Sequence, residues 1–89
     1  MASIRVAKTT KEFQDYAREA AREAKGSLID AGSTWRIKAS PKLVLKRSTM
    51  DKFFQDRPKW ERNALWESLP LLTEGSVTKQ AEDELILED

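Results

Sequence analysis

Hydrophobic residues near the N-terminus recur first at every second position and then at every third or fourth. Residues 3–7 alternate, which predicts a short strand with Ile4 and Val6 on its inner face. Thr9 followed by Glu12 is typical of a capping box at the start of a helix. The apolar positions after it share one helical face: Phe13, Tyr16, Ala17, Ala20, Ala21 and Ala24. The first third of the chain therefore predicts a strand followed by an amphipathic helix.

Two further alternating runs follow in the middle of the chain. Residues 34–39 place Trp35 and Ile37 on one face, and residues 42–47 do the same with Leu43 and Leu45. Only Ser40 and Pro41 separate the two runs. Because neighbouring runs with a short break most simply pair with each other, we expect an antiparallel hairpin here.

Helical spacing predominates in the rest of the chain. Met50, Phe53 and Phe54 fit one helix, and a second begins near Pro58 and ends at Pro70. Residues 76–89 predict an acidic C-terminal helix or a partly mobile tail, with a strand over the three apolar residues near the end as the alternative. The predicted fold is a single α+β domain over residues 1–89. Its small antiparallel sheet, the basic hairpin plus the N-terminal strand, is packed by three to four helices.

Composition excludes several classes of function. The chain has 89 residues, of which 39% are hydrophobic and 35% charged, with no histidine and no cysteine. The commonest general base, the thiol nucleophile and thiolate metal ligands are therefore missing, which argues against an enzyme, a metal site or another cofactor. Lack of cysteine also suits a reducing cytoplasm, and no apolar run approaches the roughly 18 residues of a membrane span.

The small net charge of +1 conceals a strong asymmetry. Residues 1–35 hold six basic and five acidic residues, residues 36–62 nine and three, and residues 63–89 one and seven, giving +1, +6 and −6. On the predicted hairpin, alternation gathers the cations on one face, and two more surround the next helix start: Arg36, Lys38, Lys42, Lys46, Arg47, Arg57 and Lys59. This pattern predicts contacts with the phosphates of DNA or RNA, and an ordinary solvated sheet face is the alternative.

Two groups of residues suggest a protein partner. Trp60 lies at the edge of its helix's apolar arc between charged neighbours, which favours an exposed contact. Near the C-terminus an apolar anchor stands among acids, in the order Glu84, Leu85, Ile86 and Leu87. These acids either bind a partner or fold back on the basic hairpin. A homodimer would enlarge the small core and double the basic surface.

The order of short strand, helix, basic hairpin, further helices and acidic end is similar to that of small bacterial antitoxins. This resemblance implies binding to operator DNA and to a protein through the C-terminal part. The leading interpretation is therefore a small, non-catalytic nucleic-acid-binding regulator. The alternative is an inhibitor or adaptor, for example one carried by a phage, that acts on a basic enzyme surface without binding nucleic acid.

Overall fold

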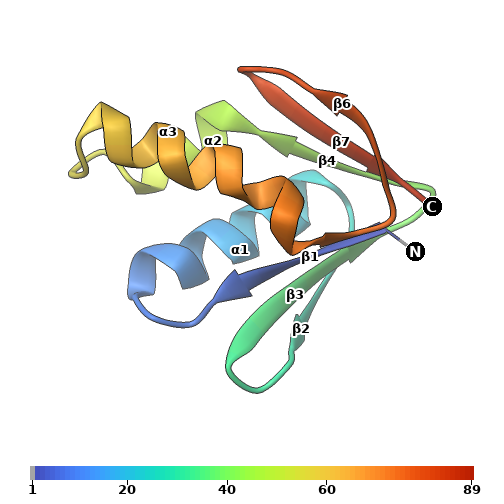
Figure 1. The fold of residues 1–89 in the computed structure, drawn as a ribbon. Helices are drawn as coiled ribbons and strands as arrows, with labels where there is room; N and C mark the ends of the chain where they lie inside the picture. The colour runs from blue at the N-terminus through green and yellow to red at the C-terminus, as the bar shows by residue number, and fades with distance from the viewer. Residues whose placement is uncertain (1) are drawn as a thin grey trace.

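The computed structural model describes residues 2–89 and divides seven strands between two antiparallel sheets (Figure 1). A four-stranded sheet has the order β2-β3-β1-β5 and a three-stranded sheet the order β4-β7-β6. In chain order the elements are β1 (Ala2–Ala7), α1 (Lys11–Glu23), β2 (Ser27–Asp30), β3 (Thr34–Ala39), β4 (Lys42–Lys46), α2 (Arg47–Phe53), α3 (Lys59–Ser68), the 3-10 helix η1 (Leu69–Leu72), β5 (Thr73–Glu74), β6 (Ser76–Gln80) and β7 (Glu84–Glu88).

The N-terminal strand and helix form as the spacing predicts. Strand β1 lies between β3 and β5, with Ile4 opposite Ile37 and both side chains in the core. Helix α1 buries the predicted apolar face against the four-stranded sheet. The predicted capping box is absent: the N-cap is Thr10, and it makes no side-chain capping hydrogen bond. Glu12 instead accepts a hydrogen bond from Arg57 at 3.2 Å.

The predicted hairpin is wrong, although both of its strands form. Strand β3 is already paired on one side with β1 and on the other with β2, so it has no free edge for β4. After Ser40 and Pro41 the chain passes to the other sheet, where β4 pairs with β7. The two halves of the basic region therefore lie in different sheets.

The C-terminal segment differs from the predicted helix or mobile tail, because residues 76–80 and 84–88 form β6 and β7. The alternative, a strand over the three apolar residues near the end, is the one that forms. Leu85 and Leu87 are 1% and 0% exposed, and they lie opposite Leu45 and Leu43 of β4 on the inner face of the three-stranded sheet. The expectation of one small sheet packed by three to four helices is thus wrong. The fold is α+β, but two sheets supply its strands.

One hydrophobic cluster joins both sheets to the helices. Tyr16 of α1 and Phe54, at the end of α2, meet edge to face with ring centroids 6.2 Å apart. Burial, and then the nearby charge of Glu23, raises the pKa of the Tyr16 hydroxyl. No helix within residues 2–89 is long and apolar enough to cross a membrane.

Candidate functional site

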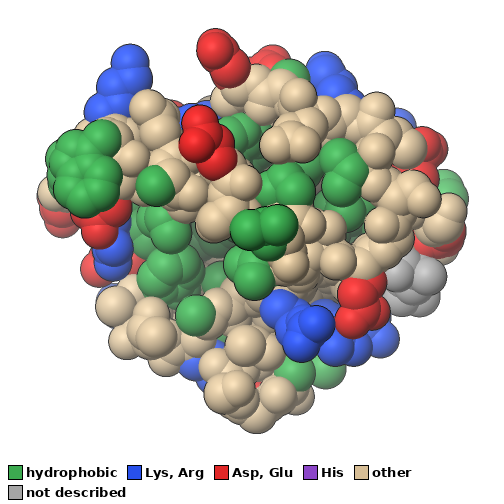
Figure 2. All heavy atoms as spheres, viewed as in Figure 1, with side chains coloured by type: hydrophobic (Ala, Val, Ile, Leu, Met, Phe, Trp, Pro, Cys, Tyr) green, Lys and Arg blue, Asp and Glu red, His purple; other side chains and the backbone are tan. Residues whose placement is uncertain are grey.

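Exposed apolar side chains gather on the outer side of α3 and η1 (Figure 2). Trp60 is 72% exposed and Leu71 86% exposed, and Leu72 is also exposed. Trp60 and Ala64 lie one turn apart and share a face of α3, and Leu71 is exposed on η1, which follows α3 directly. We call Trp60, Ala64, Leu71 and Leu72 the apolar face. Large apolar side chains exposed near one another on a protein surface often mark binding sites.

The opposite side of the same helix fixes α3 to the rest of the molecule. Trp66 and Leu69 are each 6% exposed and belong to the core cluster. The indole Nε1 of Trp66 also donates a hydrogen bond to the carbonyl of Ala81 at 3.0 Å, in the turn between β6 and β7. The apolar face is therefore presented by a helix that is already held in place.

Arg57 stabilises the start of α3. Its guanidinium donates to Glu12 at 3.2 Å and to Glu61 at 3.0 Å, and it lies 5.3 Å from the ring centroid of Phe54. The guanidinium of Arg57 is therefore already paired within the chain. Lys59, the other cation expected at this helix start, is exposed.

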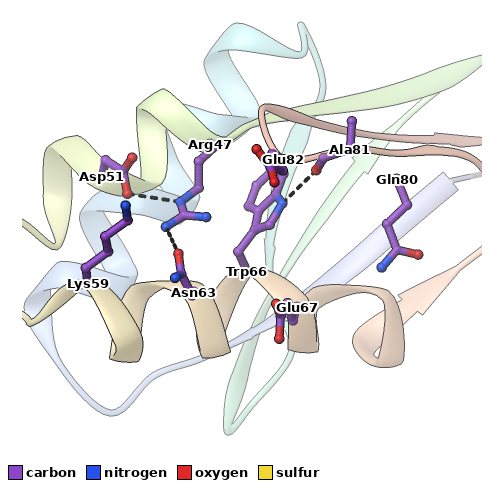
Figure 3. Close-up of a pocket in the computed structure, with 9 residues that line it drawn as sticks. All are labelled: Arg47, Asp51, Lys59, Asn63, Trp66, Glu67, Gln80, Ala81 and Glu82. Atoms are coloured by element: carbon purple, nitrogen blue, oxygen red, sulfur yellow. Dashed lines mark hydrogen bonds and ion pairs between the residues drawn. The ribbon is translucent and has the colours of Figure 1, made fainter.

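A polar cleft of about 570 Å³ is lined by residues of α2, α3 and the β6–β7 region (Figure 3). Its wall includes Arg47, whose Nε donates to Asp51 at 3.1 Å and whose Nη2 donates to Asn63 at 2.6 Å. Its other lining residues come from α3, the end of β6 and the β6–β7 turn: Lys59, Trp66, Glu67, Gln80, Ala81 and Glu82. Because both basic and acidic side chains line the cleft, it offers hydrogen-bonding positions to side chains of either charge.

The four-stranded sheet carries one part of the predicted basic region. Arg36 on β3 lies opposite Arg5 on β1, and the carboxylate of Glu74 is 3.7 Å from Arg36 and 3.9 Å from Arg5. Lys38 lies two residues further along β3, on the same side of the strand. We call Arg5, Arg36 and Lys38 the basic cluster.

The other lysines of the predicted region lie in the three-stranded sheet. Lys42 is directly opposite Glu88, and Lys46 is opposite Glu84. Glu84 also accepts a hydrogen bond from Lys79 at 3.0 Å and so raises the pKa of that lysine. The acidic end does fold back on the basic strand. The two sheets thus separate the cations that the sequence predicted on one hairpin face.

Some of the predicted partner-binding residues are exposed in the fold and others are buried. Trp60 is exposed, and Ile86 lies on the outer, partly buried side of β7 beside Glu84. Leu85 and Leu87 lie in the core, so they are unavailable to a partner of the folded chain. Leu71 and Leu72 are not among the predicted contact residues, because Pro70 predicts only the end of a helix. The available signal is two consecutive leucines directly after that proline, and only the fold shows that both are exposed.

Comparison with known proteins shows the fold. No family model and no curated protein matches the chain. One solved chain matches with a TM-score of 0.65 and 20% sequence identity. The match covers 99% of this chain and 97% of the solved chain. A second has a TM-score of 0.58 and 21% identity, with 100% of both chains covered. Both come from structures of a phenol hydroxylase–regulatory protein complex. The architecture is therefore that of a known small chain over its whole length.

Proposed function

We propose that this chain is a small regulatory protein that binds a hydroxylase enzyme and modulates its activity without catalysing a reaction itself. The full-length likeness to chains of phenol hydroxylase–regulatory protein complexes carries this proposal. The likeness extends over nearly the full length of both chains in each comparison.

The surface and the composition support the same function. Trp60 and Leu71 are exposed on a helix whose other side is anchored in the core, an arrangement suited to binding another protein. The chain also lacks the histidine and cysteine side chains on which most acid–base and nucleophilic catalysis depends. A regulator needs a stable binding surface and no reactive group.

Nucleic-acid binding has less support than the enzyme-binding alternative. The cations expected to form one phosphate-binding face are divided between two sheets, and the solved chains of similar fold come from protein–protein complexes. The apolar face on α3 and η1 contains Trp60, which the sequence favoured for a partner, but it does not contain the acidic C-terminal segment that the sequence also favoured. The roles of Arg36, Lys38, Lys42, Lys46, Arg47, Arg57 and Lys59 toward phosphates stay a prediction.

Enzyme kinetics test the proposal directly. The hydroxylase of the host organism is purified, and product formation is measured while this protein is added from none to a molar excess. We expect a saturable change in kcat that levels off near stoichiometric addition. Duplex DNA at low salt serves as the competing ligand. An unchanged kcat, no complex on gel filtration and salt-sensitive retention of the DNA would together overturn the proposal in favour of a nucleic-acid-binding role.

A further inference from the structure

We propose that the apolar face docks on an apolar patch of the hydroxylase that is bordered at one end by acidic side chains, which meet the basic cluster. This inference rests on the proposed function and adds the surface and the chemistry of the partner. Three observations carry it: the exposure of the apolar face, the rigidity of the helix beneath it and the cations at its η1 end.

The apolar face contains the residue types and the anchoring expected of an interface centre. A tryptophan and two leucines are exposed within one helical segment, and tryptophan is among the residues most enriched in interface hot spots. The helix is held from behind by Trp66 and Leu69. Because its backbone is fixed before binding, docking orders few groups and costs little conformational entropy.

The basic cluster borders this face because η1 continues directly into β5. Leu72 is followed by Thr73 and Glu74, and the Glu74 carboxylate lies within 4 Å of the guanidinium groups of both Arg5 and Arg36. Figure 2 shows Lys and Arg side chains directly below the apolar side chains of this region.

The basic cluster keeps an excess of positive charge. Its three cations, Arg5, Arg36 and Lys38, stand against the single acid Glu74, which leaves a formal charge of +2. Each guanidinium has five N–H donors, so one shared carboxylate leaves donors free for further acceptors. A partner surface that carries carboxylates here completes these interactions and gains electrostatic steering.

A second copy of the chain fits this surface poorly. Lys59 is exposed at the opposite end of the apolar face, beside Trp60. Parallel pairing of two apolar faces brings the two basic clusters together and sets like charges against each other. Antiparallel pairing brings each cluster toward a helix start where Asp56 and Glu61 balance Arg57 and Lys59, so no excess of acidic side chains meets it. The surface is therefore better suited to a different protein with an acidic border.

Binding of surface variants to the purified hydroxylase tests this assignment. Trp60→Ser is expected to weaken the complex about 30-fold, the effect of losing a hot-spot side chain. Arg5→Glu is expected to slow association about tenfold at low salt and less at high salt, because it reverses a charge that steers the encounter. The matched controls are Val77→Ser, exposed on the edge strand β6 of the three-stranded sheet, and Arg18→Glu, exposed on α1. Both controls are expected to bind like the wild type.

Tryptophan fluorescence supplies a second measurement. Trp60 is far more exposed than Trp66, so its emission is expected to shift to shorter wavelength when the hydroxylase is added, and this shift should disappear in Trp60→Phe. Circular dichroism confirms that each variant is folded.

The outcomes separate the surface from the function. If the wild type does not bind the hydroxylase, the proposed function and the docking surface both fail. If the wild type binds and Trp60→Ser and Arg5→Glu bind equally tightly, the surface is wrong and the function stands. Self-association in sedimentation that Trp60→Ser abolishes would assign the apolar face to a second copy and overturn the proposal.

Discussion

Strand β7 and the α3–η1 segment both carry large apolar side chains among charged neighbours, yet they use them in opposite ways. Leu85 and Leu87 are almost completely buried, because β7 is the central strand of its sheet and its inner face covers the core. Trp60 and Leu71 stay exposed, because α3 turns a different side, with Trp66, toward the core. Local composition is therefore similar in the two segments, and the position of each in the fold decides whether it stabilises the chain or is free to bind.

A matched pair of leucine substitutions gives the largest expected contrast between these regions. Leu85→Ala removes a core side chain and is expected to lower the free energy of unfolding by about 3 kcal/mol. Leu71→Ala removes an equal volume, but from a side chain that is 86% exposed, so it should change the free energy of unfolding by less than about 0.5 kcal/mol. Urea denaturation monitored by circular dichroism measures both. Equal losses for the two variants would mean that Leu71 is packed in solution and that the apolar face does not exist.

Much of the secondary structure could be predicted from the sequence, and the pairing of strands could not. Helical and alternating periods are local, and they correctly indicated β1, α1 and strands over residues 34–39 and 42–46. Strand pairing depends on edges that distant segments occupy: β2 and β1 take both edges of β3. In residues 76–89, the helical spacing of Val77, Ala81 and Leu85 competes with the alternation of Leu85 and Leu87, and pairing with β4 decides for the strand.

The candidate site was predictable only in part, for a related reason. Trp60 could be found because charged neighbours surround it and it lies at the edge of an apolar arc. Arg5 lies in a segment of nearly neutral charge, which gives no reason to single it out, and only the β1–β3 register brings it beside Arg36. Leu85 and Leu87 among acids have the composition of a partner-binding anchor, although in the fold both side chains lie in the core of the same chain, on a strand that pairs with β4.

Trp66 links the two regions, and removing its hydrogen bond is expected to have the next largest effect. Trp66→Phe keeps an aromatic ring and loses the donor to the Ala81 carbonyl, which should cost about 1–2 kcal/mol of stability. Faster hydrogen exchange at the Ala81 amide is expected as well, because the β6–β7 turn loses its contact with α3.

Trp35→Phe is the matched control for this substitution. In the described part of the chain the buried Nε1 of Trp35 has no hydrogen-bond partner, so its loss removes no such bond. We expect a smaller decrease in stability for Trp35→Phe than for Trp66→Phe, measured by thermal unfolding of both variants. The reverse order would show that ring volume, and not the bond to Ala81, fixes α3 against the turn.

Asp89 ties the end of the β7 segment to β1, and a smaller, pH-dependent effect is expected from Asp89→Asn. Its carboxylate accepts hydrogen bonds from Ser40 Oγ and from the Ala2 amide, each at 2.7 Å, and these bonds hold the pKa of Asp89 below its ordinary value. The ionised form therefore stabilises the fold above about pH 4, and this contribution is lost as the pH falls through the lowered pKa. Denaturation of both proteins between neutral and acidic pH measures this contribution. The free energy of unfolding of Asp89→Asn should lie below that of the wild type by a constant amount near neutral pH, and this deficit should shrink below about pH 4. A deficit that persists unchanged at the acidic end would assign it to packing.

The smallest effect is expected on the outer face of the three-stranded sheet, where Lys42 lies opposite Glu88. Lys42→Glu or Glu88→Lys alone places like charges across β4 and β7 and should cost about 0.5 kcal/mol, and the double exchange should recover most of that loss. Urea denaturation at low and at high salt measures this cycle, because salt screens an exposed pair. Recovery in the double variant would establish that the acidic end neutralises the basic strand within the fold. If the double variant does not recover, the charges of β4 and β7 act independently, and Lys42 and Lys46 regain their place as candidates for binding an external anion.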